Sequence, residues 1–207
     1  MAHPSRLPAI FAEPDAEEPD QHVLLHNITW DQYVALAESR GESASPRLTY
    51  LEGELEIMSP SGDHERAKKL IARLIEAYDE EREIGLVGMG STTFRRQAKQ
   101  RGLEPDECYC IGAQRELPDF AIEVALRAGY IDKLVVYAGL GVAEVWFWVR
   151  GAFYVHVLDG ATGEYHEQGR SKLLPELDLA RVAELINRAG GRTDREIVTD
   201  FRRDLRR

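Results

Sequence analysis

One acidic residue inside an apolar stretch constrains this chain more than any other feature. Glu123 lies within the run Phe120-Ala121-Ile122-Glu123-Val124-Ala125-Leu126, which is otherwise typical of a buried β-strand. Desolvating an unpaired carboxylate costs several kcal/mol, so a buried glutamate needs a cation, a proton or a metal ion beside it. The run therefore predicts either a structural ion pair or a functional site.

The alternation of side chains along a strand sharpens this prediction. Successive residues face opposite sides of a sheet, so Glu123 shares its face with the two small residues Ala121 and Ala125. The bulky apolar residues of the run are expected on the opposite face. The acid should therefore have room for a bound group on its own side.

Two further charged residues are close to this strand in the sequence. Asp106 precedes an apolar strand pattern at 107–111, and Lys133 opens a helical pattern after Glu123. If the two strands pair, Asp106 and Glu123 are expected to meet, and with Lys133 they form the parts of a metal-dependent phosphodiester-cleaving site. Mg²⁺ takes one or two carboxylates, a backbone carbonyl (here Val124 is the candidate) and waters. The alternative is that Asp106 caps its strand and Glu123 pairs with Lys133 or an arginine.

Hydrophobic periodicity assigns the remaining elements. The patterns predict a mixed α/β (α+β) domain with a central mixed β-sheet flanked by helices. Helices are expected at 29–39, around 67–78, at 131–140, at 179–188 and from 193, and strands at 48–51, 55–58, 87–90, 92–97, 107–111, 119–126, 143–149 and 152–158.

Composition and charge divide the chain and exclude some functions. The acidic, proline-rich start predicts a disordered leader over 1–27, followed by one domain at 28–190 and an arginine-rich C-terminal helix or tail at 191–207. No segment has the roughly 18–20 consecutive apolar residues of a membrane span, and no secretory signal opens the chain, so we expect a cytoplasmic protein. The net charge of −10 argues against non-specific coating of DNA, but not against a nuclease.

Four stretches together resemble a known family. They are Tyr50-Leu51-Glu52-Gly53-Glu54-Leu55-Glu56-Ile57-Met58-Ser59-Pro60 with His64; Gly90-Ser91-Thr92-Thr93-Phe94-Arg95 with Glu104-Pro105-Asp106; Pro118-Asp119-Phe120-Ala121-Ile122-Glu123-Val124; and Ile131-Asp132-Lys133-Leu134 with Tyr137 and Gly141-Val142-Ala143-Glu144-Val145-Trp146. In this order they resemble the Uma family of restriction-endonuclease-like proteins, within the PD-(D/E)xK nuclease superfamily. The resemblance covers roughly 28–180.

The resemblance implies a restriction-endonuclease-like core and a DNA endonuclease that depends on Mg²⁺ or Mn²⁺. It implies metal-ligand roles for Asp106 and Glu123. The classical motif places a lysine two residues after the glutamate, but Ala125 stands there in this chain. Lys133 would replace that lysine from the following helix, where Tyr137 shares its face one turn later.

Other residues match recurrent positions of the family or suggest contacts. The resemblance implies catalytic roles for Glu54 and His64; the alternatives are a solvated hairpin acid and a capping histidine. A basic cluster consists of Arg95, Arg96, Lys99 and Arg101. We expect it either to contact the DNA backbone or to be a solvated loop.

Two alternatives concern activity and assembly. The broken motif and the acidic charge also fit a catalytically inactive module that binds nucleic acid or protein. Trp146 and Trp148 are expected in the core or in an interface, and a homodimer through their strand or through the C-terminal helix is a further hypothesis.

Overall fold

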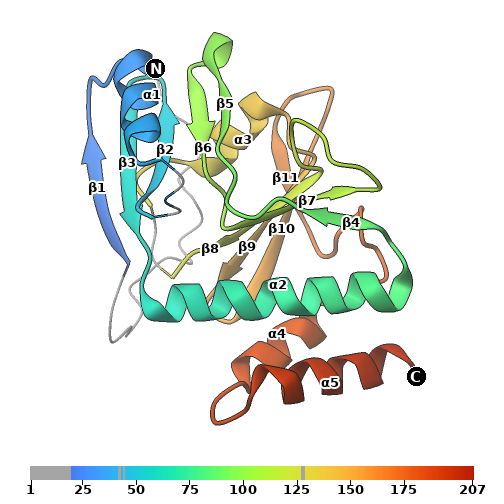
Figure 1. Ribbon diagram of the computed structural model, residues 1–207. Helices are drawn as coiled ribbons and strands as arrows, with labels where there is room; N and C mark the ends of the chain where they lie inside the picture. The colour runs from blue at the N-terminus through green and yellow to red at the C-terminus, as the bar shows by residue number, and fades with distance from the viewer. Residues whose placement is uncertain (1–19, 42, 44, 127–128) are drawn as a thin grey trace.

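The protein is a mixed α/β structure with two β-sheets and five α-helices in its described residues (Figure 1). The computed structural model describes residues 20–41, 43, 45–126 and 129–207. The predicted fold class, with a central mixed sheet flanked by helices, is confirmed. None of the described helices is long and apolar enough to cross a membrane.

The first sheet is antiparallel throughout and has the strand order β1-β3-β2-β6-β5. Its strands are β1 (Gln21–Leu25), β2 (Arg47–Leu51), β3 (Glu54–Ser59), β5 (Phe94–Arg96) and β6 (Arg101–Leu103). The predicted β2–β3 hairpin turns at Glu52 and Gly53, both with positive φ. Helix α1 (Trp30–Ser39) begins with a capping box, in which Thr29 and Gln32 bond reciprocally.

The second sheet is mixed and has the order β11-β10-β9-β8-β7-β4. Its strands are β4 (Leu86–Gly88), β7 (Glu107–Ile111), β8 (Phe120–Val124), β9 (Glu144–Val149), β10 (Ala152–Leu158) and β11 (Tyr165–Gln168). Strands β8 and β9 run parallel, and helix α3 (Lys133–Leu140) makes the crossover between them. The other neighbouring pairs are antiparallel.

The two faces of β8 pack into different cores, as the alternation predicts. Phe120, Ile122 and Val124 join a core with helices α2 (Gly62–Arg82), α4 (Leu179–Asn187) and α5 (Asp194–Leu205). Figure 1 shows α2 running along this side of the sheet, with α4 and α5 packed beneath it. Ala121 faces the other way, into the core formed with α3. Glu123, which shares the parity of Ala121, therefore lies on the α3 side.

Several segments differ from the sequence-based expectations. A disordered leader was expected over 1–27, but residues 21–25 of this range form strand β1, which pairs with β3. Residues 1–19 lie outside the described residues. Strands β6 and β11 were not expected. The C-terminal segment forms helix α5, one of the two predicted alternatives, and packs Ile197 and Phe201 into the main core.

Candidate active site

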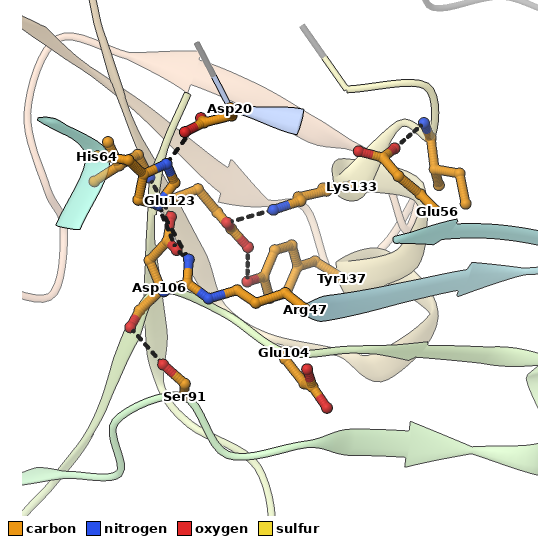
Figure 2. A network of polar contacts seen from close by, with 12 residues as sticks. Asp20, Arg47, Glu56, His64, Ser91, Glu104, Asp106, Glu123, Lys133 and Tyr137 are labelled. Atoms are coloured by element: carbon orange, nitrogen blue, oxygen red, sulfur yellow. Dashed lines mark hydrogen bonds and ion pairs between the residues drawn. The ribbon is translucent and has the colours of Figure 1, made fainter. Parts of the chain in front are cut away.

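Glu123 is buried and held by two residues of helix α3. The residue is 1% exposed. Lys133 Nζ lies 2.6 Å from Glu123 Oε2, and Tyr137 Oη donates to Oε1 at 2.5 Å (Figure 2). Burial and the negative charge of Glu123 raise the pKa of Tyr137 well above its ordinary value, so this tyrosine stays a hydrogen-bond donor. Lys133 and Tyr137 lie one turn apart on α3, as the sequence suggested.

Asp106 lies beside Glu123, at the end of the neighbouring strand β7. Its Oδ2 accepts a hydrogen bond of 2.6 Å from the backbone N–H of Val124, the residue after Glu123. Its Oδ1 is paired with Arg47 and lies 2.9 Å from Nε2 of His64 (Figure 2). The antiparallel pairing of β7 and β8 thus brings the two predicted acids together. Arg47, however, already neutralises Asp106.

His64 connects this pair to the N-terminal segment. It lies in the first turn of α2, fully buried, and its Nδ1 is 3.0 Å from Oδ2 of Asp20. Burial lowers the pKa of His64, and the cations Arg47 and Lys133 act in the same direction, outweighing Asp20. Both ring nitrogens are engaged inside the protein, so His64 joins the site as a buried linking residue.

Glu56, rather than Glu54, occupies the buried position on strand β3. Glu56 is 2% exposed, and its carboxylate accepts from the backbone N–H groups of Tyr130 and Ile131 at 2.7 and 2.8 Å. Burial alone would raise the pKa of Glu56, but hydrogen bonds from His22 and Ile131 hold it below its ordinary value. The predicted Glu54 is half-exposed, contacts His26 and is not brought to the site. Like Glu123, Glu56 is an acid within an apolar strand, and that signal would have found it.

A cavity opens beside Glu123. The residues that line it include Asp20, His22, Glu56, Glu123, Val124 and Lys133. Asp106 is not among them, and it is fully buried behind the Val124 backbone. Of the predicted metal-site residues, Glu123, Val124 and Lys133 therefore line this cavity.

The charges around the cavity do not balance. The buried groups comprise four carboxylates and two cationic side chains, namely Asp20, Glu56, Asp106 and Glu123 with Arg47 and Lys133. Hydrogen bonds from His64 and Ser61 bring the pKa of Asp20 below its ordinary value despite its burial. Leaving the histidines aside, these six side chains carry two negative charges in excess.

The carboxylates of this cluster are oxygen donors, the ligand type that a hard divalent cation takes. Among the described residues, no three acidic, histidine or cysteine side chains are placed to hold an ion by themselves. Mg²⁺ commonly takes only one or two carboxylates and completes its shell with water and phosphate oxygens. An ion at Asp106 would have to share that carboxylate with Arg47.

The predicted basic cluster lies at the β5–β6 hairpin, outside the cavity lining. Arg95 and Lys99 are exposed. Arg96 donates to the carbonyl of Gly139 at 3.2 Å, and Arg101 pairs with Glu52 at 3.4 Å. Both strands of the hairpin contact α3, the helix that carries Lys133. The cluster is thus a neighbour of the site, and two of its four cations, Arg96 and Arg101, bond to other groups of the protein.

The tryptophan strand does not form an exposed interface. Trp146 and Trp148 are 0% and 4% exposed and pack in the main core of the protomer. The hypothesis of a homodimer through this strand is wrong for that reason. The apolar residues Ile197 and Phe201 of the C-terminal helix are likewise buried within the protomer.

The chain matches a protein family and is similar to a solved structure. A family model described as "Uma2: Putative restriction endonuclease" matches residues 30–187. Among solved structures, the chain is similar to the crystal structure of "a putative nuclease belonging to DUF820" from Anabaena variabilis, with a TM-score of 0.51 and 15% sequence identity. The match covers 75% of this chain and 99% of the other and shows a shared fold. No curated protein matches the chain.

Proposed function

The chain belongs to the Uma2 family, and we propose on that premise that it is an endonuclease that hydrolyses phosphodiester bonds in DNA with a divalent cation. The observation that carries the proposal is the pairing of Glu123 with Lys133 in the wall of a cavity. A carboxylate and a lysine beside an open space can bind a metal ion and a phosphate together. The family match and the shared fold with a nuclease support the same reaction class.

The metal would be held by Glu123 and the carbonyl of Val124, with Asp106 completing the set. Mg²⁺ or Mn²⁺ there would supply charge stabilisation for the phosphoryl group and acidify a bound water. Tyr137 fixes the orientation of Glu123 through its hydrogen bond. Asp106 fixes the strand through the Val124 N–H.

Lys133 acts on the phosphate or on the attacking water. Its side chain is 18% exposed and lines the cavity. A cation in such a place stabilises negative charge that develops on the phosphate during attack. The exposed Arg95 and Lys99 would contact the DNA backbone on either side of the cleaved bond.

A cleavage assay with matched variants tests the proposal. Purified protein is incubated with DNA and, separately, RNA in Mg²⁺, Mn²⁺ or EDTA, and products are resolved on gels. Metal-dependent cleavage of DNA is expected, and Glu123→Gln should reduce it at least about 100-fold, the cost typical of losing one transition-state contact. Glu54→Gln, a half-exposed acid outside the cavity lining, is the control and should retain activity. Failure of the wild type to cleave DNA under any of these conditions would contradict the proposal.

A second candidate is an inactive module that binds nucleic acid or protein. The pairing of Asp106 with Arg47 favours it, because this carboxylate is neutralised without a metal ion. Calorimetry with Mn²⁺ separates the two candidates. Saturable binding that is lost in Glu123→Gln supports the enzyme, whereas an absence of binding together with retained DNA affinity supports the module.

Assembly and location stay predictions of the sequence. Cleavage of both DNA strands by an enzyme with one site per chain commonly needs two copies. Sedimentation of the full chain with and without DNA tests for a homodimer, and fractionation of cells tests the cytoplasmic location.

A further inference from the structure

His22 on strand β1 has one ring nitrogen fixed and the other free. Its Nδ1 lies 2.6 Å from Oε1 of Glu56. The other oxygen of Glu56 is held by two backbone N–H groups, so the carboxylate has a fixed position. The Nε2 atom of His22 is buried and has no hydrogen-bond partner among the described residues. A buried ring nitrogen without a partner in the protein is costly unless a ligand or water bonds to it.

This free nitrogen belongs to a residue of the active-site cavity. His22 and Glu56 line the same cavity as Glu123, Val124 and Lys133. His64, by comparison, has Nδ1 against Asp20 and Nε2 against Asp106 and Arg47, so it offers no nitrogen to a substrate. His22 thus lines the cavity and has a buried ring nitrogen without a hydrogen-bond partner among the described residues.

The Glu56–His22 pair has the arrangement of a general acid with its orienting carboxylate. A carboxylate that accepts the Nδ1–H hydrogen bond fixes the tautomer and stabilises the protonated ring. The pKa of Glu56 is lowered, so the carboxylate is charged and able to do this. Tyr130 packs edge-on against the ring, with centroids 6.3 Å apart, and further restricts its orientation.

We propose that His22 is a further catalytic residue, the general acid that protonates the leaving oxygen. The inference rests on the proposed nuclease function. In the step, the oxygen of the attacking water bonds to phosphorus and loses a proton to solvent, while the bond from phosphorus to the leaving oxygen breaks. The proton on Nε2 passes to that oxygen, which departs as a hydroxyl group, and solvent then restores the proton to His22.

This residue lies outside the part of the chain that the family model matches. The match begins at residue 30, whereas strand β1 spans Gln21–Leu25. The pairing of β1 with β3 sets His22 opposite Met58, two residues from Glu56. The N-terminal strand therefore adds a group to the site that the matched region alone does not contain.

A substrate with a better leaving group tests the proposal. Single-turnover cleavage is measured on an ordinary phosphodiester and on a bridging phosphorothiolate in which sulfur replaces the leaving oxygen. A thiolate leaves without protonation, so it does not need a general acid. His22→Asn removes Nε2 while its amide can still donate to Glu56. It should slow cleavage of the phosphodiester about 100-fold or more and change cleavage of the phosphorothiolate less than about 3-fold.

The controls separate this proposal from the nuclease function itself. His26→Asn alters an exposed histidine near the end of the same strand and should leave both rates unchanged. Equal losses on the two substrates in His22→Asn, or no loss on either, would overturn the role of His22 while the enzyme remains a nuclease. A wild type that cleaves neither substrate overturns the nuclease function and the role of His22 together.

Discussion

Glu123 and Glu144 are buried glutamates on neighbouring strands of one sheet, and each is 1% exposed, but their partners differ completely. Glu144 accepts from Trp146 Nε1, from Ser171 Oγ and from the backbone N–H groups of Lys172 and Leu173 at 2.6 to 3.0 Å. Glu123 is held by a cation and a phenol, and it lines a cavity. The two acids lie on opposite faces of the sheet, since Glu144 shares the parity of Trp146 and Glu123 that of Ala121.

The difference shows that burial of a carboxylate does not identify its role. Four neutral donors satisfy Glu144 within the fold, so it links the start of β9 to the segment before α4. Glu123 has one charged and one neutral donor and keeps lone pairs for a ligand. The kind of partner and the presence of open space beside the acid distinguish a structural carboxylate from a candidate catalytic one.

Replacing each glutamate by glutamine should give the largest difference between Glu144 and Glu123, in the free energy of unfolding. In Glu144→Gln, the amide NH₂ faces N–H and O–H donors, and we expect a loss of about 2–4 kcal/mol in the free energy of unfolding. In Glu123→Gln, the excess negative charge around the cavity falls, and the partly solvated Lys133 tolerates the change. Its stability should therefore lie within about 1 kcal/mol of the wild type. Urea unfolding measures both. A loss at Glu123 as large as that at Glu144 would remove the distinction.

Metal binding should stabilise the wild type and not the Glu123→Gln variant. A ligand that binds only the folded state at ten times its Kd adds about 1.4 kcal/mol, or roughly 3–5 °C in Tm for a domain of this size. Thermal unfolding with Mg²⁺, Mn²⁺ and EDTA measures the shift. Glu54→Gln should shift as the wild type does. An equal metal shift in Glu123→Gln would mean that the ion binds elsewhere.

The decrease in the free energy of unfolding at acidic pH should depend on Glu56. Its pKa in the folded protein is below the ordinary 4.5, so the stability that it contributes is fully present above about pH 4.5. That contribution is lost as the pH falls through the lower folded value. Glu56→Gln should therefore flatten the decline of stability below pH 4.5. Unfolding curves between pH 3 and pH 7 test this, with Glu54→Gln expected to follow the wild type. An unchanged decrease at acidic pH in Glu56→Gln would contradict the prediction.

The smallest effect is expected at the basic hairpin. Arg95→Ala and Lys99→Ala remove exposed cations without breaking an internal contact seen among the described residues. Each should weaken DNA binding a few-fold, because one phosphate contact is lost. The slope of the logarithm of affinity against the logarithm of salt concentration should fall by about one, and the free energy of unfolding should not change. Fluorescence anisotropy at several salt concentrations checks this. Arg170→Ala, at an exposed position after β11, is the control. A similar loss in this control would assign no special role to the hairpin.

Local patterns were sufficient for much of the fold. Both capping boxes, the β2–β3 hairpin and the long amphipathic helix α2 follow from residues that are near in sequence. The strands β6 and β11 were not predicted because short polar strands exist only through pairing with a neighbour. Strand β1 was assigned to the leader because it follows the acidic, proline-rich start of the chain.

The sequence by itself determined that Glu123 lies in a buried strand, that it faces away from the bulky residues of that strand, and that a lysine follows on the next helix. Periodicity and burial cost carry this information, and both are local. Only the tertiary structure decided the partners. It placed Arg47 on Asp106, put Glu56 rather than Glu54 at the site, and brought in His22 of strand β1 and Asp20 just before that strand. These contacts join residues far apart in the chain, and the pairing of strands, which no single segment encodes, brings them together.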